Sequence, residues 1–200
     1  MPTISNIRRS EQILTALSLI EVIENSDYTK SHSLRVAKLV KEIGIKMGLG
    51  SEENFLLRRA ALFHDIGKIG FSHIIMKTEP ITDEEMEIIK GHCEIGYKLL
   101  MKLGMPQEAN LVLQHHERPD GSGYPKGLKY GEIDDLTNIL VVADVYDAAI
   151  MERPYKKGDE YQNVMLNMYK DADKKYPLYI LQILHEIVIE SLDKKKTLDK

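Results

Sequence analysis

The sequence predicts an all-α fold in one domain. Apolar residues recur at the helical spacing of three to four positions in nearly every segment of the chain. Stretches that contain Gly or Pro separate these segments, and no stretch alternates apolar and polar residues as a strand would. The chain has 200 residues, of which 43% are hydrophobic, and this is enough to bury a single core.

The first predicted helix covers residues 11–24 and carries a narrow apolar stripe. Two arrangements suit such a stripe: the helix caps the domain core, or it pairs with its copy in a homodimer. We therefore treat residues 1–26 as an N-terminal segment with its own helix. The stripe consists of Ile13, Leu17 and Ile20.

Two further helices are predicted before residue 66. The first spans 32–47 and stops at Gly48 and Gly50, because glycine accepts the left-handed conformation that ends a helix. The second begins at Ser51, whose hydroxyl is a suitable N-cap, with two glutamates on the positive end of the helix dipole. This helix is expected to run into the dipeptide His64-Asp65.

The middle of the chain predicts two more helices. Thr82 and Glu85 have the spacing of a capping box, which opens the helix that carries His92. Pro106 lies near the start of the next helix, which ends in the pair His115-His116.

The last third of the chain begins with a loop and ends with helices. Residues 118–127 contain too many Gly and Pro residues for a helix and predict a long, shaped loop. An apolar helix is expected over 136–150, and one or two helices over 161–192 with a break at Pro177. Residues 193–200 are charged and are expected to fray.

Composition excludes several classes of protein. The 27 basic and 31 acidic residues give a net charge of −4, so no global positive field would recruit a nucleic acid polymer. The single cysteine, Cys93, excludes an internal disulfide and a thiolate zinc cluster, and suits a reducing compartment. No apolar run reaches the length of a membrane span. We therefore expect a soluble cytoplasmic protein.

Five of the seven histidines, with two aspartates, form a pattern typical of a metal centre. Imidazole and carboxylate groups are ligands that first-row transition metals accept. Seven donors are too many for one ion, but they suit two ions that share one carboxylate. His73 and His185 are assigned no role. The predicted ligands are His32, His64, Asp65, His92, His115, His116 and Asp144.

Such a centre predicts hydrolysis of a phosphate ester. Two ions about 3.5–4 Å apart bind a hydroxide between them and contact both the attacking and the leaving oxygen. Lys68, three positions after Asp65, supplies positive charge for the phosphate, and Arg153 and Lys156 do so beyond the helix of Asp144. Gly123 in the loop permits close approach of the backbone, and Tyr124 offers a ring and a hydroxyl.

At these positions the sequence resembles the HD-GYP family, a branch of the HD superfamily of metal-dependent phosphohydrolases. The likeness runs from residue 27 to residue 157. The most specific part is the histidine pair followed by Gly-Ser-Gly-Tyr-Pro. The matching segments are residues 28–33, 64–70, 91–96, 115–125 and 143–148.

The resemblance implies an HD-superfamily helical bundle with a long Gly-Tyr-Pro loop and a catalytic domain over 27–192. It implies hydrolysis of a cyclic dinucleotide, chiefly cyclic di-GMP, to linear pGpG and often to GMP, by a metal-bridging hydroxide. The seven predicted ligands would hold iron or manganese, with Asp65 as the bridge. Asp65 and Lys68 would be the catalytic residues. Contacts to the dinucleotide would come from Lys68, Gly123, Tyr124, Arg153 and Lys156.

One departure from the family and two alternative functions shape this prediction. Some family members carry a glutamate four residues before the first histidine, which supports a third metal; Tyr28 stands there in this chain, so a two-metal site is expected. The first alternative is a cyclic dinucleotide receptor that turns over negligibly. The second is an HD phosphohydrolase of another phosphate ester. The sequence leaves the metal open among iron, manganese, nickel and zinc, and the dinucleotide between cyclic di-GMP and cyclic GMP-AMP.

Overall fold

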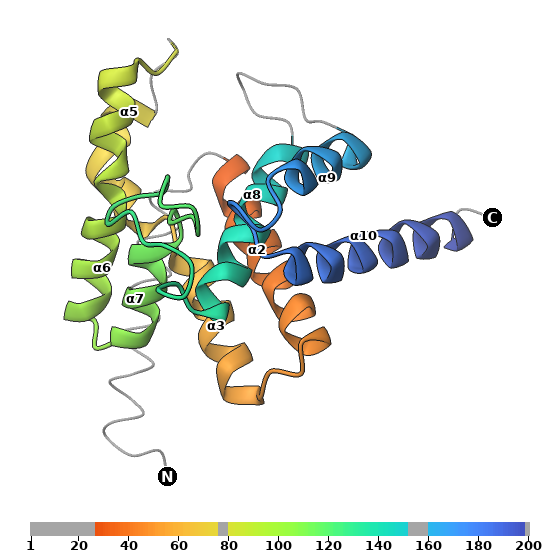
Figure 1. Ribbon diagram of the computed structural model, residues 1–200. Coiled ribbons are helices and arrows are strands. Elements are labelled where there is room, and N and C mark those ends of the chain that lie inside the picture. The colour runs from red at the N-terminus through yellow and green to blue at the C-terminus, as the bar shows by residue number, and fades with distance from the viewer. Residues whose placement is uncertain (1–26, 76–79, 152–159, 199–200) are drawn as a thin grey trace.

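The computed structural model describes residues 27–75, 80–151 and 160–198, and Figure 1 shows that this part of the chain is built from helices. Among these residues there is no strand, only isolated bridges between Asp120 and Lys129 and between Ala172 and Tyr176. The all-α prediction is confirmed. The predicted helix over 11–24 and the cations Arg153 and Lys156 lie outside the described residues.

The elements follow one another with short connections, apart from the loop between α7 and α8. In chain order they are α2 (Asp27–Lys46), α3 (Ser51–Phe63), the 3-10 helix η1 (Ile66–Phe71), α4 (Ser72–Ile75), α5 (Asp83–Lys90), α6 (His92–Lys102), α7 (Pro106–Gln114), α8 (Asp135–Ile150), α9 (Tyr161–Lys170) and α10 (Leu178–Leu198).

The junction between α2 and α3 differs from the prediction in one detail. Gly48 has a φ of +77°, the left-handed conformation expected after the end of α2. Ser51, however, is the first residue of α3, and Gly50 is its N-cap. The carboxylate of Glu53 accepts a hydrogen bond from the Gly50 amide at 2.9 Å. A charged acceptor therefore satisfies the amide there, and the Ser51 hydroxyl is not the cap.

The segment that leads to His92 is divided between two helices. The capping box is present: the Thr82 hydroxyl accepts from the Glu85 amide at 3.2 Å, and the Glu85 carboxylate accepts from the Thr82 amide at 2.8 Å. The prediction of one helix from Thr82 through His92 is nevertheless wrong. Helix α5 ends at Lys90, and His92 is the first residue of α6. The intervening residue, Gly91, bonds back to the Ile88 carbonyl at 3.1 Å, as the last turn of a helix does.

The C-terminal segment forms two helices with Pro177 between them, as predicted. Helix α10 continues to Leu198, beyond the expected end of the helical segment at residue 192, and the fraying expected from Asp193 onward stays a prediction. The hydroxyl of Thr197 donates to the Asp193 carbonyl at 2.8 Å.

The buried apolar residues form two clusters, and these divide the bundle into two halves (Figure 1). The larger cluster joins α2, α3 and α8 with α9 and α10, and it includes Val40, Leu140 and Leu181. The smaller one joins the end of α3 and η1 with α6 and α7, and it includes Phe63 and Leu100. Helix α3 contributes residues to both clusters and connects the two halves.

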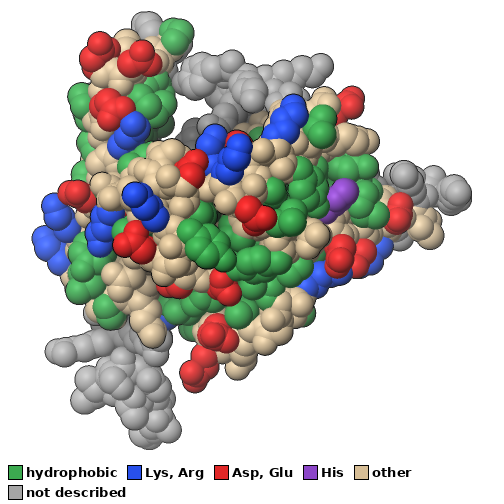
Figure 2. Space-filling view, viewed as in Figure 1, with side chains coloured by type: hydrophobic (Ala, Val, Ile, Leu, Met, Phe, Trp, Pro, Cys, Tyr) green, Lys and Arg blue, Asp and Glu red, His purple; other side chains and the backbone are tan. Residues whose placement is uncertain are grey.

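The distribution of surface charge agrees with the near balance of acidic and basic residues in the sequence. On the face seen in Figure 2, acidic and basic side chains are interspersed, and no single basic patch stands out. In the described part of the chain, no helix combines the length and the apolar character that crossing a membrane requires.

Candidate metal centre

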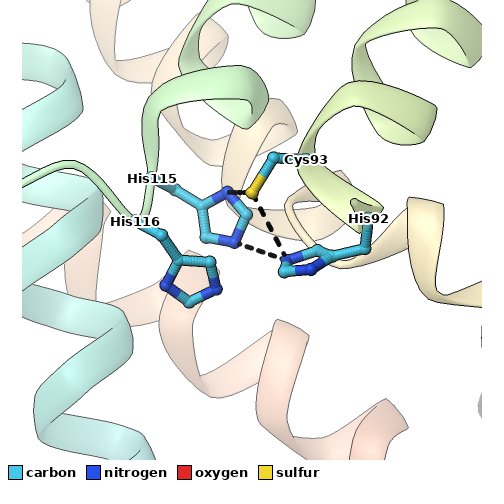
Figure 3. Close-up of side chains that lie close together, drawn as sticks. All are labelled: His92, Cys93, His115 and His116. Carbon is cyan, nitrogen blue, oxygen red and sulfur yellow. Dashed lines mark hydrogen bonds between the residues drawn. The ribbon is translucent and has the colours of Figure 1, made fainter. Parts of the chain in front are cut away.

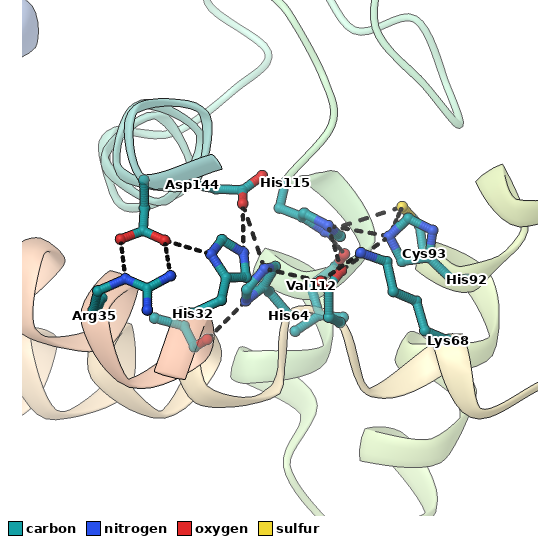
Figure 4. A network of polar contacts seen from close by, with 12 residues as sticks. His32, Arg35, His64, Lys68, His92, Cys93, Val112, His115 and Asp144 are labelled. Carbon is teal, nitrogen blue, oxygen red and sulfur yellow. Dashed lines mark hydrogen bonds and ion pairs between the residues drawn. The ribbon is translucent and has the colours of Figure 1, made fainter. Parts of the chain in front are cut away.

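The seven predicted ligands, which come from five separate segments, converge at the boundary between the two halves. Six of them are buried and His116 is partly buried, so the centre lies inside the molecule (Figure 4). The segments are α2 for His32, the end of α3 for His64 and Asp65, the start of α6 for His92, the end of α7 for His115 and His116, and α8 for Asp144.

The ligand atoms fall into two groups, each with its donor atoms within 4.8 Å of one another. One group combines His32, His64 and Asp144, and belongs to the half around α2 and α8. The other combines His92, His115 and His116 with Cys93, and belongs to the half around α6 and α7 (Figure 3). We call these the α2–α8 group and the α6–α7 group.

The carboxylate of Asp65 lies between the two groups. Its Oδ2 is 3.5 Å from His64 Nε2, in the α2–α8 group. Its Oδ1 is 3.6 Å from His92 Nε2 and 3.9 Å from His115 Nε2, in the α6–α7 group. One oxygen thus faces each group, which is the arrangement that a bridging carboxylate needs.

Four of the five histidines have the same orientation. Each places Nδ1 within hydrogen-bonding distance of an oxygen on the outside of the centre and turns Nε2 inward, so a neutral ring that donates Nδ1–H to this oxygen presents the Nε2 lone pair to the centre. The acceptors are Asp147 Oδ2 for His32 at 2.7 Å, the Ala61 carbonyl for His64 at 2.8 Å, the Ile89 carbonyl for His92 at 2.7 Å and the Val112 carbonyl for His115 at 2.6 Å.

The inward Nε2 atoms form a set that suits bound cations. Nε2 of His92 lies 3.2 Å from Nε2 of His115, and both rings have already committed Nδ1–H elsewhere. Burial, the largest effect on each ring, lowers the pKa of both, so neither gains the proton that a hydrogen bond between them would need. His64 Nε2 is buried with no hydrogen-bond partner among the described residues. One metal ion in each group would satisfy these atoms, and the donor set therefore fits metal binding.

The two aspartates of the centre are ionised. Burial raises the pKa of Asp65, but the Lys68 ammonium and then His64 outweigh it and hold this pKa well below its usual value. Burial also raises the pKa of Asp144, but His32, whose Nε2 lies 3.1 Å from Asp144 Oδ1, and His64, whose Nε2 lies 3.6 Å from it, hold this pKa well below the usual value. The centre thus offers carboxylates in the form that binds metal.

Lys68 lies beside the centre on η1. The chain leaves α3 and tightens into this 3-10 helix, and Lys68 Nζ reaches Asp65 Oδ2 at 2.5 Å. A Cβ on Gly67 would lie 1.9 Å from the His92 carbonyl oxygen, so only glycine allows η1 to pack against α6. The ammonium is held at the rim, with 29% of the side chain exposed.

The Gly-Tyr-Pro loop folds back onto the histidine pair. The Tyr124 amide donates to the His116 carbonyl at 3.1 Å, and the Tyr124 ring stacks on the His116 ring at 4.7 Å. A Cβ on Gly123 would lie 2.4 Å from the Arg118 amide nitrogen, so Gly123 is required for packing within the loop. Glu117, fully buried, accepts hydrogen bonds from the amides of residues 126 and 128 at 2.6 and 2.9 Å and closes the loop.

Sequence reasoning missed several residues of the surroundings. Asp147 accepts a hydrogen bond from His32, and Arg35 binds the same carboxylate (Figure 4). Asp147 lies three residues after Asp144, and Arg35 lies three residues after His32. This spacing places each residue beside a predicted ligand on the same helix, and it was the signal that could have identified them. Cys93 lies within the α6–α7 group, with Sγ 3.7 Å from His92 Nε2. Burial raises the pKa of its thiol to about 12, so without metal it is a neutral thiol.

The HD domain family model matches residues 18–177 of this chain. The chain belongs to the HD domain family. This HD domain protein also has curated relatives. It is 34% identical over 186 residues to a cyclic di-GMP phosphodiesterase of Thermotoga maritima, covering 91% of this chain and 50% of the relative. It is 38% identical over 148 residues to the 3'3'-cGAMP-specific phosphodiesterase 3 of Vibrio cholerae, covering 73% of this chain and 32% of the relative.

A third relative is the cyclic di-GMP phosphodiesterase response regulator RpfG of Xanthomonas campestris, 42% identical over 127 residues, which are 62% of this chain and 33% of the relative. The HD domain described here thus spans at most about half the length of these curated relatives. The predicted resemblance is confirmed.

Solved structures show the same fold. Bd1817, an HD-GYP protein from Bdellovibrio bacteriovorus, superposes with a TM-score of 0.67 at 25% identity, over 80% of this chain and 52% of that chain. The HD domain of the phosphodiesterase PgpH of L. monocytogenes superposes with a TM-score of 0.64 at 18% identity, over 89% of this chain and 98% of that chain. The predicted HD-superfamily bundle is confirmed.

Proposed function

We propose that this HD domain is a two-metal phosphodiesterase that hydrolyses a cyclic dinucleotide, most readily cyclic di-GMP, to linear pGpG and then to GMP. The observation that carries the proposal is the Asp65 carboxylate, with one oxygen facing each of two histidine groups. The names of the relatives from Thermotoga maritima and Xanthomonas campestris support cyclic di-GMP, and that of the relative from Vibrio cholerae supports cyclic GMP-AMP as the second substrate to test.

Each group would hold one divalent ion, and Asp65 would contact both. The mixture of imidazole and carboxylate donors suits iron or manganese. Once bound, two such ions supply a nucleophile at neutral pH and polarise the phosphodiester. The ligands are His32, His64 and Asp144 in the α2–α8 group, and His92, His115 and His116 in the α6–α7 group.

Among the described residues, Lys68 is well placed to act on the substrate. Its ammonium is held at Asp65 and is partly exposed at the rim of the centre. A phosphate bound beside Asp65 would therefore be in reach of a fixed positive charge. Charge accumulates on the phosphoryl oxygens in the transition state, and an ammonium fixed in advance stabilises it there. Arg153 and Lys156, which lie outside the described residues, remain proposed contacts to the phosphates or bases of the dinucleotide on the basis of sequence.

The walls of the centre serve to exclude water. Apolar clusters lie on both sides of the predicted ligands, and the Tyr124 ring of the loop lies against His116 of the α6–α7 group. Exclusion of bulk water strengthens the electrostatic interactions between Lys68 and a bound phosphate. It also directs hydrolysis to the bond held at the centre.

Product analysis tests the proposal. Purified protein would be loaded anaerobically with Fe(II) or Mn(II), incubated with cyclic di-GMP or 3'3'-cGAMP, and analysed by chromatography beside a His64→Ala, Asp65→Ala variant. Linear product from the wild type alone is expected, and GMP would show that the second bond is cut as well. No product from either dinucleotide, in protein that carries two metals, would refute the phosphodiesterase and favour the receptor.

A further inference from the structure

His116 differs from the other four histidines of the centre in how its ring is held. It follows His115, the C-cap of α7, whose own Nδ1 lies 2.6 Å from the Val112 carbonyl oxygen. In the described part of the chain, neither ring nitrogen of His116 forms a hydrogen bond of the kind that orients His32, His64 and His92. The contacts of its ring among the described residues are with other aromatic rings.

Three aromatic rings contact His116. Two belong to other predicted ligands, His115 at 4.0 Å and His92 at 5.1 Å between ring centroids. The third is Tyr124, whose ring lies 4.7 Å away and only 29° from parallel. Tyr124 is thus the one ring contact of His116, among the described residues, that does not come from another ligand.

Tyr124 is itself held firmly. Its amide donates to the His116 carbonyl, and Gly123 lets the backbone pack against Arg118 and Glu117. The ammonium of Lys90, at the end of α5, lies 5.4 Å from the centre of the tyrosine ring and adds a cation–π contact. One face of the ring is therefore covered by His116, and a nucleotide base would have to compete for that face.

We propose that Tyr124 is a positioning residue for His116, and that its ring sets the metal affinity of the α6–α7 group. A planar neighbour close to parallel restricts rotation of the imidazole about its terminal torsion, which is otherwise broad. The stacked ring thus does for His116 what an outer hydrogen bond does for the other histidines. This inference rests on the two-metal site proposed above. It also requires the ring of Tyr124 and not its hydroxyl.

Metal titration tests the inference without a turnover assay. Protein freed of metal with a chelator would be titrated with Mn(II) alone, and the free ion measured by electron paramagnetic resonance. Wild type is expected to bind two ions. Tyr124→Leu should bind the first ion normally and the second about 10–100-fold more weakly, the range seen when the support of a ligand is removed. Tyr124→Phe should bind both ions as wild type does.

Tyr130 provides a matched control, because it lies in the same loop region with 81% of its surface exposed, so Tyr130→Leu should bind both ions normally. If circular dichroism shows that Tyr124→Leu is unfolded, Tyr124→Met takes its place, since methionine fills the space without a planar ring. Two normal ions in the leucine or methionine variant would overturn the inference, and so would an equal loss in Tyr124→Phe. Fewer than two ions in wild type would instead overturn the two-metal site itself.

Discussion

Asp147 accepts a hydrogen bond from His32 Nδ1 at 2.7 Å, and Arg35 holds the same carboxylate with two bonds of 2.7 and 2.8 Å. The other hydrogen-bonded histidines of the centre donate to neutral backbone carbonyls. His32 therefore faces a charged acceptor that is fixed by a guanidinium. Such an acceptor makes the ligand more basic and fixes its ring, so the α2–α8 group should bind metal more tightly than the α6–α7 group.

Asp147→Asn should weaken the tighter of the two metal sites. The amide keeps the shape of the side chain but removes the charge behind His32, so we expect the Mn(II) affinity of the α2–α8 group to fall about 10–100-fold. The titration described above measures it. Asp135→Asn, at the exposed start of the same helix, is the control and should change neither site. Unchanged affinity in Asp147→Asn would show that the outer carboxylate has no influence on the metal.

Lys68→Met should separate catalysis from metal binding. Its ammonium contacts Asp65 but is not a ligand, so two ions should remain bound while turnover of the cyclic dinucleotide falls about 100–1,000-fold. Metal content and kcat would be measured on the same sample. Lys98→Met, on an exposed position of α6, should match wild type. Loss of metal along with activity would assign Lys68 a structural part instead.

Gly67→Ala should destabilise the fold. The added methyl group would meet the backbone of His92 and Gly96, at 1.9 Å from the nearest carbonyl oxygen and 2.6 Å from the nearest amide nitrogen, and neither atom can move without shifting α6. Crowding of this kind costs about 1–3 kcal/mol or more in the free energy of unfolding, which urea denaturation measures. At Gly50 a methyl group would find its nearest contact at 3.5 Å, so Gly50→Ala should cost less. Equal losses in both variants would contradict this account.

The stability of the metal-free protein should have a maximum near pH 6.5. Burial lowers the pKa of His32, but hydrogen bonds to Asp144 and Asp147 outweigh this and raise it from 6.5 to about 9. The protonated His32 ring therefore stabilises the fold. Its contribution to the free energy of unfolding is complete below pH 6.5 and is lost as the pH rises through about 9. Burial lowers the pKa of His116 to about 3. Below pH 6.5 the ring is protonated in the unfolded chain but stays neutral in the fold, so the free energy of unfolding decreases as the pH falls below 6.5.

Thermal unfolding of chelator-treated protein between pH 5 and pH 9.5 checks this expectation about the metal-free form. In His32→Gln the fall in Tm on the alkaline side should be smaller, because the titrating ring is gone. Stability that rises steadily from pH 6.5 to pH 9 in the wild type would contradict the raised pKa of His32.

Local signals in the sequence predicted most of the helices and the candidate ligands. The capping box at Thr82 and the left-handed Gly48 have local physical causes, and the structure contains both. The break at Gly91 and the cap at Gly50 were missed because they depend on how neighbouring elements meet. The same holds for Asp147 and Glu117. A carboxylate in a sequence does not reveal its partner 115 residues away, as His32 is from Asp147.

The position of the centre between two apolar clusters links metal occupancy to the arrangement of the whole domain. Three ligands belong to the α2–α8 half, three to the α6–α7 half, and Asp65 lies between them. Ions that bind only when the two halves have their folded arrangement stabilise that arrangement. By thermodynamic reciprocity, anything that holds the halves together raises the affinity for the ions. If the proposed two-metal site is occupied, metal supply would govern how long the folded domain survives as well as its activity.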